Sequence, residues 1–479
     1  MRIAVVARNI GLVLLLNALF MLIAVVVSML YGFDKGFTPL LFSAAITAII
    51  GSLPFVFTRK QEEITIREGY VIAVFSWLFS CLFGMIPYLL SGGEFSWINA
   101  WYESVSGFTT TGGTVLTNIE ALPHSLLFWR ASTQWIGGIG VILFVLLIFP
   151  QPSTIRLRLS RIEMPAFSQD TYRFKAKETV RVIAFVYFGL TLLETLLLSL
   201  AGMNVFDAIC HSFTTISTGG LSTKNAGLSS YDNVAIETIV MVFMVVSSLH
   251  FGMIFLFITG KSMSLLKSPV TRYYIFSTLL IGLLISLNLW VGGTYNSLGT
   301  SLRHGLFQTF SLVSTTGFSS SDTSLWPNFA LLLLFFMIFQ GGCSGSTAGG
   351  IKADRMLISF HSIRAQITKR LHPRSVVQAH VGGQTIDLDV TSAVNLFIVL
   401  FLLVFFVVAL LLTAAGIELK EALSASIAHL SNVGPGFGSV GPMSNYSALN
   451  GFSKFVLSLT MIIGRKELFG FFILFASGK

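Results

Sequence analysis

The stretch SGFTTTGGTVL (residues 106–116) contains one of four short runs in which threonine, serine or asparagine lead into glycine between long apolar segments. Each run follows a segment long enough for a short helix, and the four recur at intervals of roughly a hundred residues. One such glycine alone would be typical of helix packing. Four copies at one recurring place predict four pore loops around one axis. The runs are TTTGG at 109–113, ISTGG at 216–220, STTGF at 314–318 and SNVGPG at 431–436.

Aligned on glycine, the four runs define one triplet each, which we expect to form the narrow filter of a pore. Glycine permits the positive-φ backbone that turns successive carbonyls toward one line, and such carbonyls can replace the hydration shell of a monovalent cation. The triplets contain no acidic residue, so a carboxylate ring for divalent ions is not indicated. The triplets are Thr110-Thr111-Gly112, Ser217-Thr218-Gly219, Thr315-Thr316-Gly317 and Asn432-Val433-Gly434.

The composition is that of a protein embedded in a membrane. Of the 479 residues, 54% are hydrophobic and only 11% are charged, whereas a soluble domain carries about a quarter charged residues. Apolar runs of about 20 residues predict ten transmembrane helices, so we expect an all-α polytopic membrane protein. The expected spans are 9–31, 38–57, 69–90, 125–149, 179–201, 234–259, 274–292, 329–360, 391–415 and 453–476.

The last eight spans divide into four pairs, each with one of the four runs between its members. This order predicts four helix–pore loop–helix repeats in a pseudo-fourfold arrangement, preceded by two extra helices. The expected domain limits are 1–60 for the two extra helices, 61–177 for repeat 1 with a basic loop, 178–272 for repeat 2, 273–385 for repeat 3 and 386–479 for repeat 4.

Lysine and arginine set the expected orientation. Most of them lie before the first span or after the second, fourth, sixth and eighth spans, and loops of this kind stay cytoplasmic. Both termini are therefore expected in the cytoplasm and the four runs outside. The formal net charge of +9 follows from this bias, so no nucleic-acid partner is indicated. The basic loops 151–177 and 361–380 are compatible both with topological charge beside lipid headgroups and with docking of a cytosolic partner.

The segment GGCSGSTAGG at 341–350 interrupts the eighth span. Its glycines disfavour a lipid-facing helix, because each costs about 1 kcal/mol relative to alanine. We expect an unwound intramembrane loop that gates the pore below the filter; a helix seam of small residues is the alternative. A phosphate-binding loop is excluded, because the spacing to Lys352 is one residue too long and no strand precedes it. The expected gate residues in this segment are Gly341, Gly342, Ser344, Gly345, Ser346, Gly349 and Gly350.

Arg465 lies inside the last expected span, where a charge is costly unless protein or water surrounds it. One interpretation is a structural ion pair with Glu467 or a neighbouring helix. The other makes Arg465 part of the gate, with its guanidinium opposing a passing cation. For Glu103 and Asp207, on the short helices, attraction of cations and bracing of the filter both stay open. Other polar residues in spans are expected to be interhelical partners rather than proton relays: Arg130, Gln134, Glu194 and His250.

The chain resembles the TrkH/KtrB/HKT superfamily of potassium transporters over nearly its whole length, and the bacterial TrkH branch in particular. The resemblance is carried by FQGGCSGSTAGGIKADR at 339–355, SGFTTTGGTVL at 106–116 and STTGFSSSD at 314–322. It implies a channel-like subunit of the bacterial inner membrane, usually a homodimer. It also implies control by a cytosolic TrkA-type regulatory ring that binds NAD or ATP.

The resemblance also implies an assignment of the filter. A serine at the first filter glycine accompanies sodium permeation in this superfamily, and Gly112 at that place implies a preference for potassium. Asn432-Val433 and Phe318 depart from strict symmetry, which indicates an uneven filter that is less selective than a true fourfold channel. The family's filter glycines correspond to Gly112, Gly219, Gly317 and Gly434.

Gated, passive uptake of potassium is the expected function, with K+ as the permeant ion at the triplets and no covalently bound cofactor. The alternative is a secondary symporter that couples potassium to H+ or Na+, which requires alternating access. Such transporters usually show inverted repeats, whereas all four expected pore loops enter from one side. The sequence contains no evident nucleophile–base or metal-ligand constellation, so an enzyme is not expected.

Overall fold

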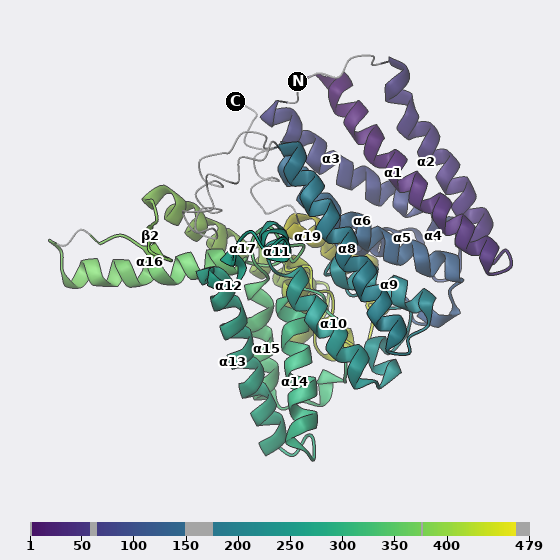
Figure 1. The fold of residues 1–479 in the computed structure, drawn as a ribbon. Coiled ribbons are helices and arrows are strands. Elements are labelled where there is room, and N and C mark those ends of the chain that lie inside the picture. Colours follow the sequence, from purple (N-terminus) through teal and green to yellow (C-terminus); the bar gives the residue numbers. More distant parts are fainter. Residues whose placement is uncertain (1, 58–64, 149–175, 375–376, 466–479) are drawn as a thin grey trace.

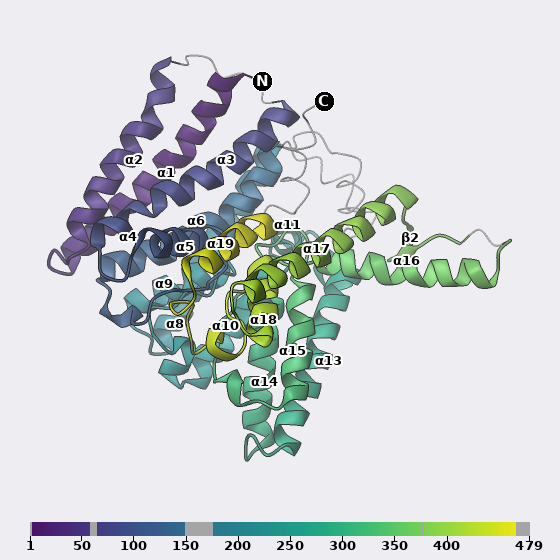
Figure 2. The ribbon, with the colours of Figure 1, turned by 180° about the vertical axis from the view of Figure 1, so that it is seen from behind.

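The computed structural model describes residues 2–57, 65–148, 176–374 and 377–465. Over these residues the chain is built from helices, with one antiparallel hairpin of strands β1 (His380–Val381) and β2 (Gln384–Thr385). Figures 1 and 2 show the helices gathered in one body, from which α16 (Ala353–Leu371) and the hairpin extend as an arm.

Long and short helices are mixed along the chain. Together with α16, the longest are α1 (Ile3–Leu30), α2 (Phe37–Phe57), α3 (Ile66–Gly84), α6 (His124–Ile148), α8 (Ala176–Leu200), α13 (Pro269–Val291) and α17 (Leu388–Ala414). Shorter helices are α4 (Ile86–Ser91), α10 (Val234–Ser247), α11 (Phe251–Ile258), α12 (Ser264–Lys267), α15 (Asn328–Gln340) and α19 (Gly451–Arg465).

Four further helices each lead directly into one of the four glycine runs, and we refer to them as pore helices. A short 3-10 turn then follows each run. The pore helices are α5 (Trp97–Phe108), α9 (Val205–Ile216), α14 (Leu298–Val313) and α18 (Leu419–Leu430). The turns are η1 (Ile119–Ala121), η3 (Gly227–Tyr231), η4 (Thr323–Leu325) and η5 (Gly438–Val440).

Six described helices are long and apolar enough to cross a membrane, or seven spans if the bent pair α10–α11 counts as one. The expected span at 329–360 is divided, since α15 ends at Gln340 and α16 begins at Ala353. The expected span at 453–476 runs past the described residues. A mostly helical, polytopic membrane protein is therefore confirmed, whereas the count of ten and the pseudo-fourfold arrangement stay predictions.

Helices α1 and α2 lie side by side at one edge of the body (Figures 1 and 2) because glycines let their backbones approach. A Cβ atom added to Gly11 would lie 2.5 Å from the carbonyl oxygen of Gly51. The α1 residue Asn17 is fully buried, and its amide donates to the Ser80 hydroxyl of α3 at 2.9 Å. This bond joins α1 to α3.

The expectation of one continuous span at 234–259 is wrong, because the chain bends by 108° between α10 and α11. His250 caps α11, with its Nδ1 accepting from two backbone N–H groups of the first turn at 3.1 and 3.4 Å. The Ser248 carbonyl at the break accepts from the backbone N–H of Cys343 at 2.8 Å. The bend is therefore stabilised by a segment that lies far away in the sequence.

Residues 341–352 form no helix, so the unwinding predicted for 341–350 is present. Three of its glycines have positive φ angles, which favours glycine over residues with a side chain. The loop folds back on itself, because Ile351 donates to the Phe339 carbonyl at 2.9 Å and Ala353 donates to the Gly342 carbonyl at 3.0 Å. The three positive φ angles are +64° at Gly341, +79° at Gly345 and +69° at Gly350.

The four pore helices end in the same way, and this ending sets the register of the triplets. Two residues after each helix, a residue with a side chain adopts the left-handed conformation, and a left-handed glycine follows two residues later. The first position is held by Thr110 (φ 51°), Thr218 (φ 54°), Thr315 (φ 60°) and Asn432 (φ 56°). The third position is held by Gly112 (φ 85°), Gly220 (φ 73°), Gly317 (φ 78°) and Gly434 (φ 94°).

The backbone geometry places the second triplet one residue later than the glycine alignment predicted. Its members are Thr218-Gly219-Gly220, whereas Ser217 caps the C-terminus of α9. The physical cause is the Schellman ending of the helix, in which the N–H of the middle residue bonds back across the last turn. That bond joins Thr111 to Ser106 at 2.9 Å, Gly219 to Thr214 at 2.8 Å, Thr316 to Ser311 at 3.0 Å and Val433 to Ala428 at 2.7 Å.

The left-handed conformation of Gly220 predicts that a side chain at this position lowers the stability of the protein. We expect Gly220→Ala to lower the thermal stability of the purified protein, because its φ of +73° costs a residue with a Cβ about 1–2 kcal/mol. The new methyl would also overlap the Thr316 carbonyl. Gly189→Ala is the matched control, since a Cβ there meets no atom within 4 Å. Equal melting temperatures of the two variants would contradict the register.

Candidate functional site

The four triplets pack against one another in a closed ring. The missing Cβ of each third-position glycine faces the middle carbonyl oxygen of the next triplet, at a distance that leaves no room for a methyl group. These contacts run from the first triplet to the second, third and fourth, and return to the first. They pair Gly112 with the Gly219 oxygen, Gly220 with Thr316, Gly317 with Val433, and Gly434 with Thr111.

The ring has the chemistry of a cation site. Apart from Gly219, which has no side chain, the side chains of its first and middle positions are fully buried. The triplets continue from the C-terminal ends of four pore helices. Helix C-termini carry partial negative charge, which favours a cation. Backbone carbonyls can replace the water ligands of a monovalent cation without adding net charge. The arrangement is therefore suited to hold a dehydrated monovalent cation.

Asn432 makes the ring asymmetric. Its amide donates to the Thr111 hydroxyl at 2.9 Å and to the Met461 carbonyl of α19 at 3.0 Å. This residue therefore links the fourth triplet to the first and to the last described helix. Tyr446 adds a further contact that the sequence did not indicate, since its hydroxyl donates to the Gly434 carbonyl at 2.8 Å.

A hollow with an empty volume of about 570 Å³ adjoins the ring and is lined by residues that follow all four triplets. Two basic side chains line it, and both have acidic partners. Lys224 lies 3.9 Å from Asp207, and Arg130 lies 3.4 Å from Glu103. The positive charges that line this hollow are therefore paired with carboxylates.

Glu103 and Asp207 hold the segments that leave the ring. Glu103 is fully buried and accepts from the Thr114 hydroxyl and from the Val115 backbone N–H. Asp207 accepts from the Thr223 hydroxyl at 2.7 Å. Of the two roles left open from the sequence, these contacts favour bracing of the filter.

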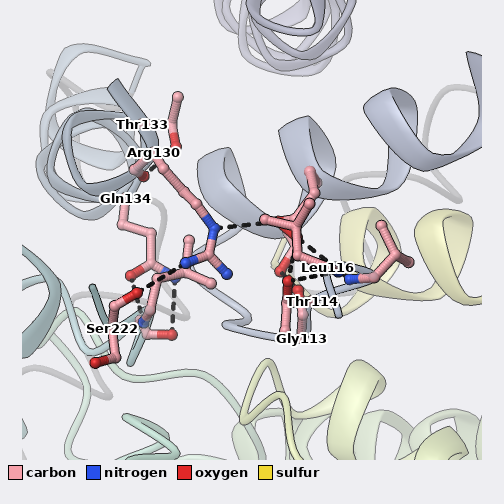
Figure 3. A network of polar contacts seen from close by, with 12 residues as sticks. Gly113, Thr114, Leu116, Arg130, Thr133, Gln134 and Ser222 are labelled. Carbon is pink, nitrogen blue, oxygen red and sulfur yellow. Dashed lines mark hydrogen bonds and ion pairs between the residues drawn. The ribbon is translucent and has the colours of Figure 1, made fainter. Parts of the chain in front are cut away.

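Arg130 and Gln134 lie on one face of α6 and point toward the segment that contains and follows the second triplet, as Figure 3 shows. Arg130 donates to the Ser222 carbonyl at 2.9 Å. Gln134 donates to the Gly219 carbonyl at 2.8 Å and accepts from the Leu221 N–H at 3.1 Å. Both residues were expected to be interhelical partners, and Arg130 is one through Glu103 of α5. Its bond to Ser222 and both described bonds of Gln134 go to the segment that forms and leaves the ring.

The loop 341–350 lies against the side of the ring at which the pore helices end. The Gly349 N–H donates to the Thr315 hydroxyl at 2.8 Å. The Thr347 hydroxyl donates to the carbonyl of Ile216, the last residue of a pore helix, at 3.1 Å. A Cβ on Gly349 would overlap the Ser431 carbonyl. The structure thus brings the expected gate residues and three of the four pore segments together.

The serines of the loop 341–350 form hydrogen bonds to residues close to them in the sequence. Ser344 donates to the Asp354 carboxylate at 2.7 Å, and Ser346 donates to the Cys343 carbonyl at 2.6 Å. Gly342 packs closely against Ala348 and Ser248, so a Cβ there would overlap both. The loop is thus a folded unit that bridges the bend of α10–α11 and the ring.

Arg465 joins this unit from the end of α19. It is buried, with 5% of its surface exposed. Its Nη1 donates to the Thr347 carbonyl at 2.6 Å, and its Nη2 donates to the Gly137 carbonyl of α6 at 3.5 Å. The described partners are therefore carbonyls rather than carboxylates, while Glu467 lies outside the described residues. Thr347 and Gly137 were missed in the sequence because neither carries a charge or stands next to Arg465.

The chain is similar to known cation transport proteins. The family model of TrkH, described as a cation transport protein, matches residues 37–479. The Trk system potassium uptake protein TrkH of Salmonella typhimurium is 34% identical over 98% of this chain and 98% of its own length. The protein of the same name from Halomonas elongata is 33% identical over 99% of this chain and 98% of its own length.

A solved structure is similar over the same extent. The crystal structure of the potassium transporter TrkH from Vibrio parahaemolyticus superposes with a TM-score of 0.90 at 34% identity, and the match covers 99% of this chain and 98% of that chain. Family model, relatives and fold thus cover nearly the whole sequence. The chain belongs to the TrkH family of cation transport proteins.

Proposed function

We propose that this protein carries potassium into a bacterial cell across the inner membrane, through the ring of four triplets. The observation that carries the proposal is the closed cycle of glycine–carbonyl contacts, which gathers oxygen-bearing backbone from four separate segments. Similarity to relatives named as potassium uptake proteins and to a solved potassium transporter supports potassium as the cargo. Potassium is the transported substrate here and not a resident cofactor.

The pathway is built from four repeats around one pseudo-fourfold axis, with ten transmembrane helices and two of them outside the repeats. The repeated order of pore helix, triplet and 3-10 turn supports this arrangement and the domain limits expected from the sequence. With the corrected register, the filter glycines are those at the third positions. The Asn432 contacts make the filter uneven and therefore only moderately selective.

The loop 341–350 and Arg465 form the gate below the filter. The loop bonds to Thr315 on the inner side of the ring, and Arg465 holds the loop through the Thr347 carbonyl. The guanidinium places a buried positive charge beside the path that a cation must take. Opening requires the loop to leave this position, which breaks the bond between Arg465 and Thr347.

Both termini lie in the cytoplasm, and a cytosolic TrkA-type ring that binds NAD or ATP controls the gate of a homodimer. The Trk system names of the relatives support partner proteins. The arm formed by α16 continues directly from the gate loop and extends away from the body (Figures 1 and 2). It presents Arg364, Lys369 and Arg370 as exposed basic residues, so it offers a contact surface for such a partner. Much of the other basic loop, 151–177, lies outside the described residues.

Ion flux in liposomes tests the proposed function. We expect the purified protein to admit K+ and Rb+ down their gradients with no proton or sodium gradient, and to admit Na+ more slowly. Isotope or fluorescent-indicator uptake measures the three rates under matched gradients. Strict dependence of K+ uptake on a proton or sodium gradient would support the symporter and overturn the passive pore. Absence of any K+ uptake would overturn both.

Arg465→Ala tests the gate. We expect K+ flux in liposomes to rise about tenfold, because losing a charged hydrogen bond of at least about 1.4 kcal/mol to the closed loop favours opening. Arg303→Ala is the control: Arg303 also bonds to a buried carboxylate, Glu237, at 2.7 Å, but lies away from the loop. Both variants should lose thermal stability and only Arg465→Ala should gain flux. Equal flux in the two variants would show that Arg465 is structural.

A further inference from the structure

The second triplet differs from the other three at its middle position. Three middle residues carry a branched side chain, whereas the corrected register places a glycine in the second triplet. The four middle residues are Thr111, Gly219, Thr316 and Val433. Gly219 has no positive φ angle, so its backbone alone does not require glycine. Something else occupies the space of its side chain.

That space is filled by Gln134 of α6. An ideal Cβ on Gly219 would lie 2.5 Å from Oε1 and 2.6 Å from Nε2 of the Gln134 carboxamide. Gln134 is fully buried, and both ends of its amide are used. Nε2 donates to the Gly219 carbonyl at 2.8 Å, and Oε1 accepts from the Leu221 N–H at 3.1 Å. One side chain therefore fixes the backbone on both sides of Gly220.

The first and third triplets show what a hydroxyl at the middle position does, whereas Val433 of the fourth triplet has none. The Thr111 hydroxyl bonds to that of Thr109 at 2.8 Å, and the Thr316 hydroxyl bonds to that of Ser314 at 2.8 Å. These bonds tie the middle residue to the end of its own pore helix. In the second segment the corresponding Ser217 hydroxyl donates to the Thr214 carbonyl at 3.3 Å, as the Ser314 hydroxyl does to the Ser311 carbonyl at 3.0 Å. Gly219 has no hydroxyl that could add the second bond.

We propose that Gln134 is a positioning residue of the cation filter, which supplies from another helix the brace that the second triplet lacks. The inference rests on the proposed function, because it concerns the carbonyl ring through which the cation passes. The Gly219 oxygen both faces Gly112 of the neighbouring triplet and accepts from Gln134. Without this bond the oxygen is free to move, and a loosened ring can close around a smaller ion. Gln134 therefore supports the preference for K+ over Na+.

Substitutions at Gln134 and Gly219, made singly and together, test the proposed role of Gln134 directly. We expect Gln134→Ala to lower the K+/Na+ flux ratio in liposomes by about threefold to tenfold, as the loss of one or two hydrogen bonds at the ring implies. Gly219→Thr alone should lower it as well, because the new side chain collides with Gln134. The double variant Gln134→Ala/Gly219→Thr should recover most of the ratio. An unchanged ratio in Gln134→Ala, or a double variant no better than the worse single one, would overturn the inference.

Two further variants separate positioning from stability. Gln134→Met keeps much of the volume but removes both hydrogen bonds, so it should lower the ratio even if the alanine variant does not fold. Asn17→Ala removes a buried amide that bonds to Ser80, remote from the ring, and should lower the melting temperature without changing the ratio. A changed ratio in Asn17→Ala would overturn the specific role of Gln134.

A failure of the inference is distinguishable from a failure of the proposed function. If the wild-type protein admits no K+, the proposed function fails. The packing of Gln134 against Gly219 can still be tested by melting temperature. This temperature should fall in Gln134→Ala and in Gly219→Thr and should recover in the double variant. If the wild-type protein prefers K+ and Gln134→Met keeps that preference, the inference alone fails.

Discussion

The structure depends on a steric constraint: four glycines approach four carbonyl oxygens so closely that a Cβ fits at none of them. Each contact joins two different segments, so the ring closes only when all four pore helices end in the same way. The Schellman endings provide that uniformity, and they hold three threonines and one asparagine in the left-handed region. This conformation costs each of these residues on the order of 1–3 kcal/mol, which surrounding contacts must offset.

A second constraint governs the backbone inside the membrane. Unpaired N–H and C=O groups are tolerated there only where protein or water satisfies them. The breaks at 248–250 and 341–352 meet this requirement together, because Cys343 donates to Ser248 and Phe251 donates to Gly345. Neither break would be stable in lipid alone. The bend of α10–α11 and the loop 341–350 therefore form one unit, and a movement of the loop must also disturb the bend.

Local patterns predicted the kinds of element well and their partners poorly. The four glycine runs and the unwound 341–350 segment were evident because glycine content is a local property. The register of the second triplet was not, since Gly219 and Gly220 are adjacent glycines and only the end of α9 decides between them. The bend before His250 had one signal, a histidine at a helix start. The contact of Arg465 with Thr347 had none, because it joins residues 118 apart.

The central claim is that a cation is held by the ring of middle carbonyls. Rubidium replaces potassium and is visible by anomalous scattering, so crystals grown in a rubidium salt test the claim most directly. The account predicts an anomalous peak on the axis among the carbonyl oxygens of Thr111, Gly219, Thr316 and Val433. Rubidium peaks confined to other parts of the protein, with none inside the ring, would contradict it.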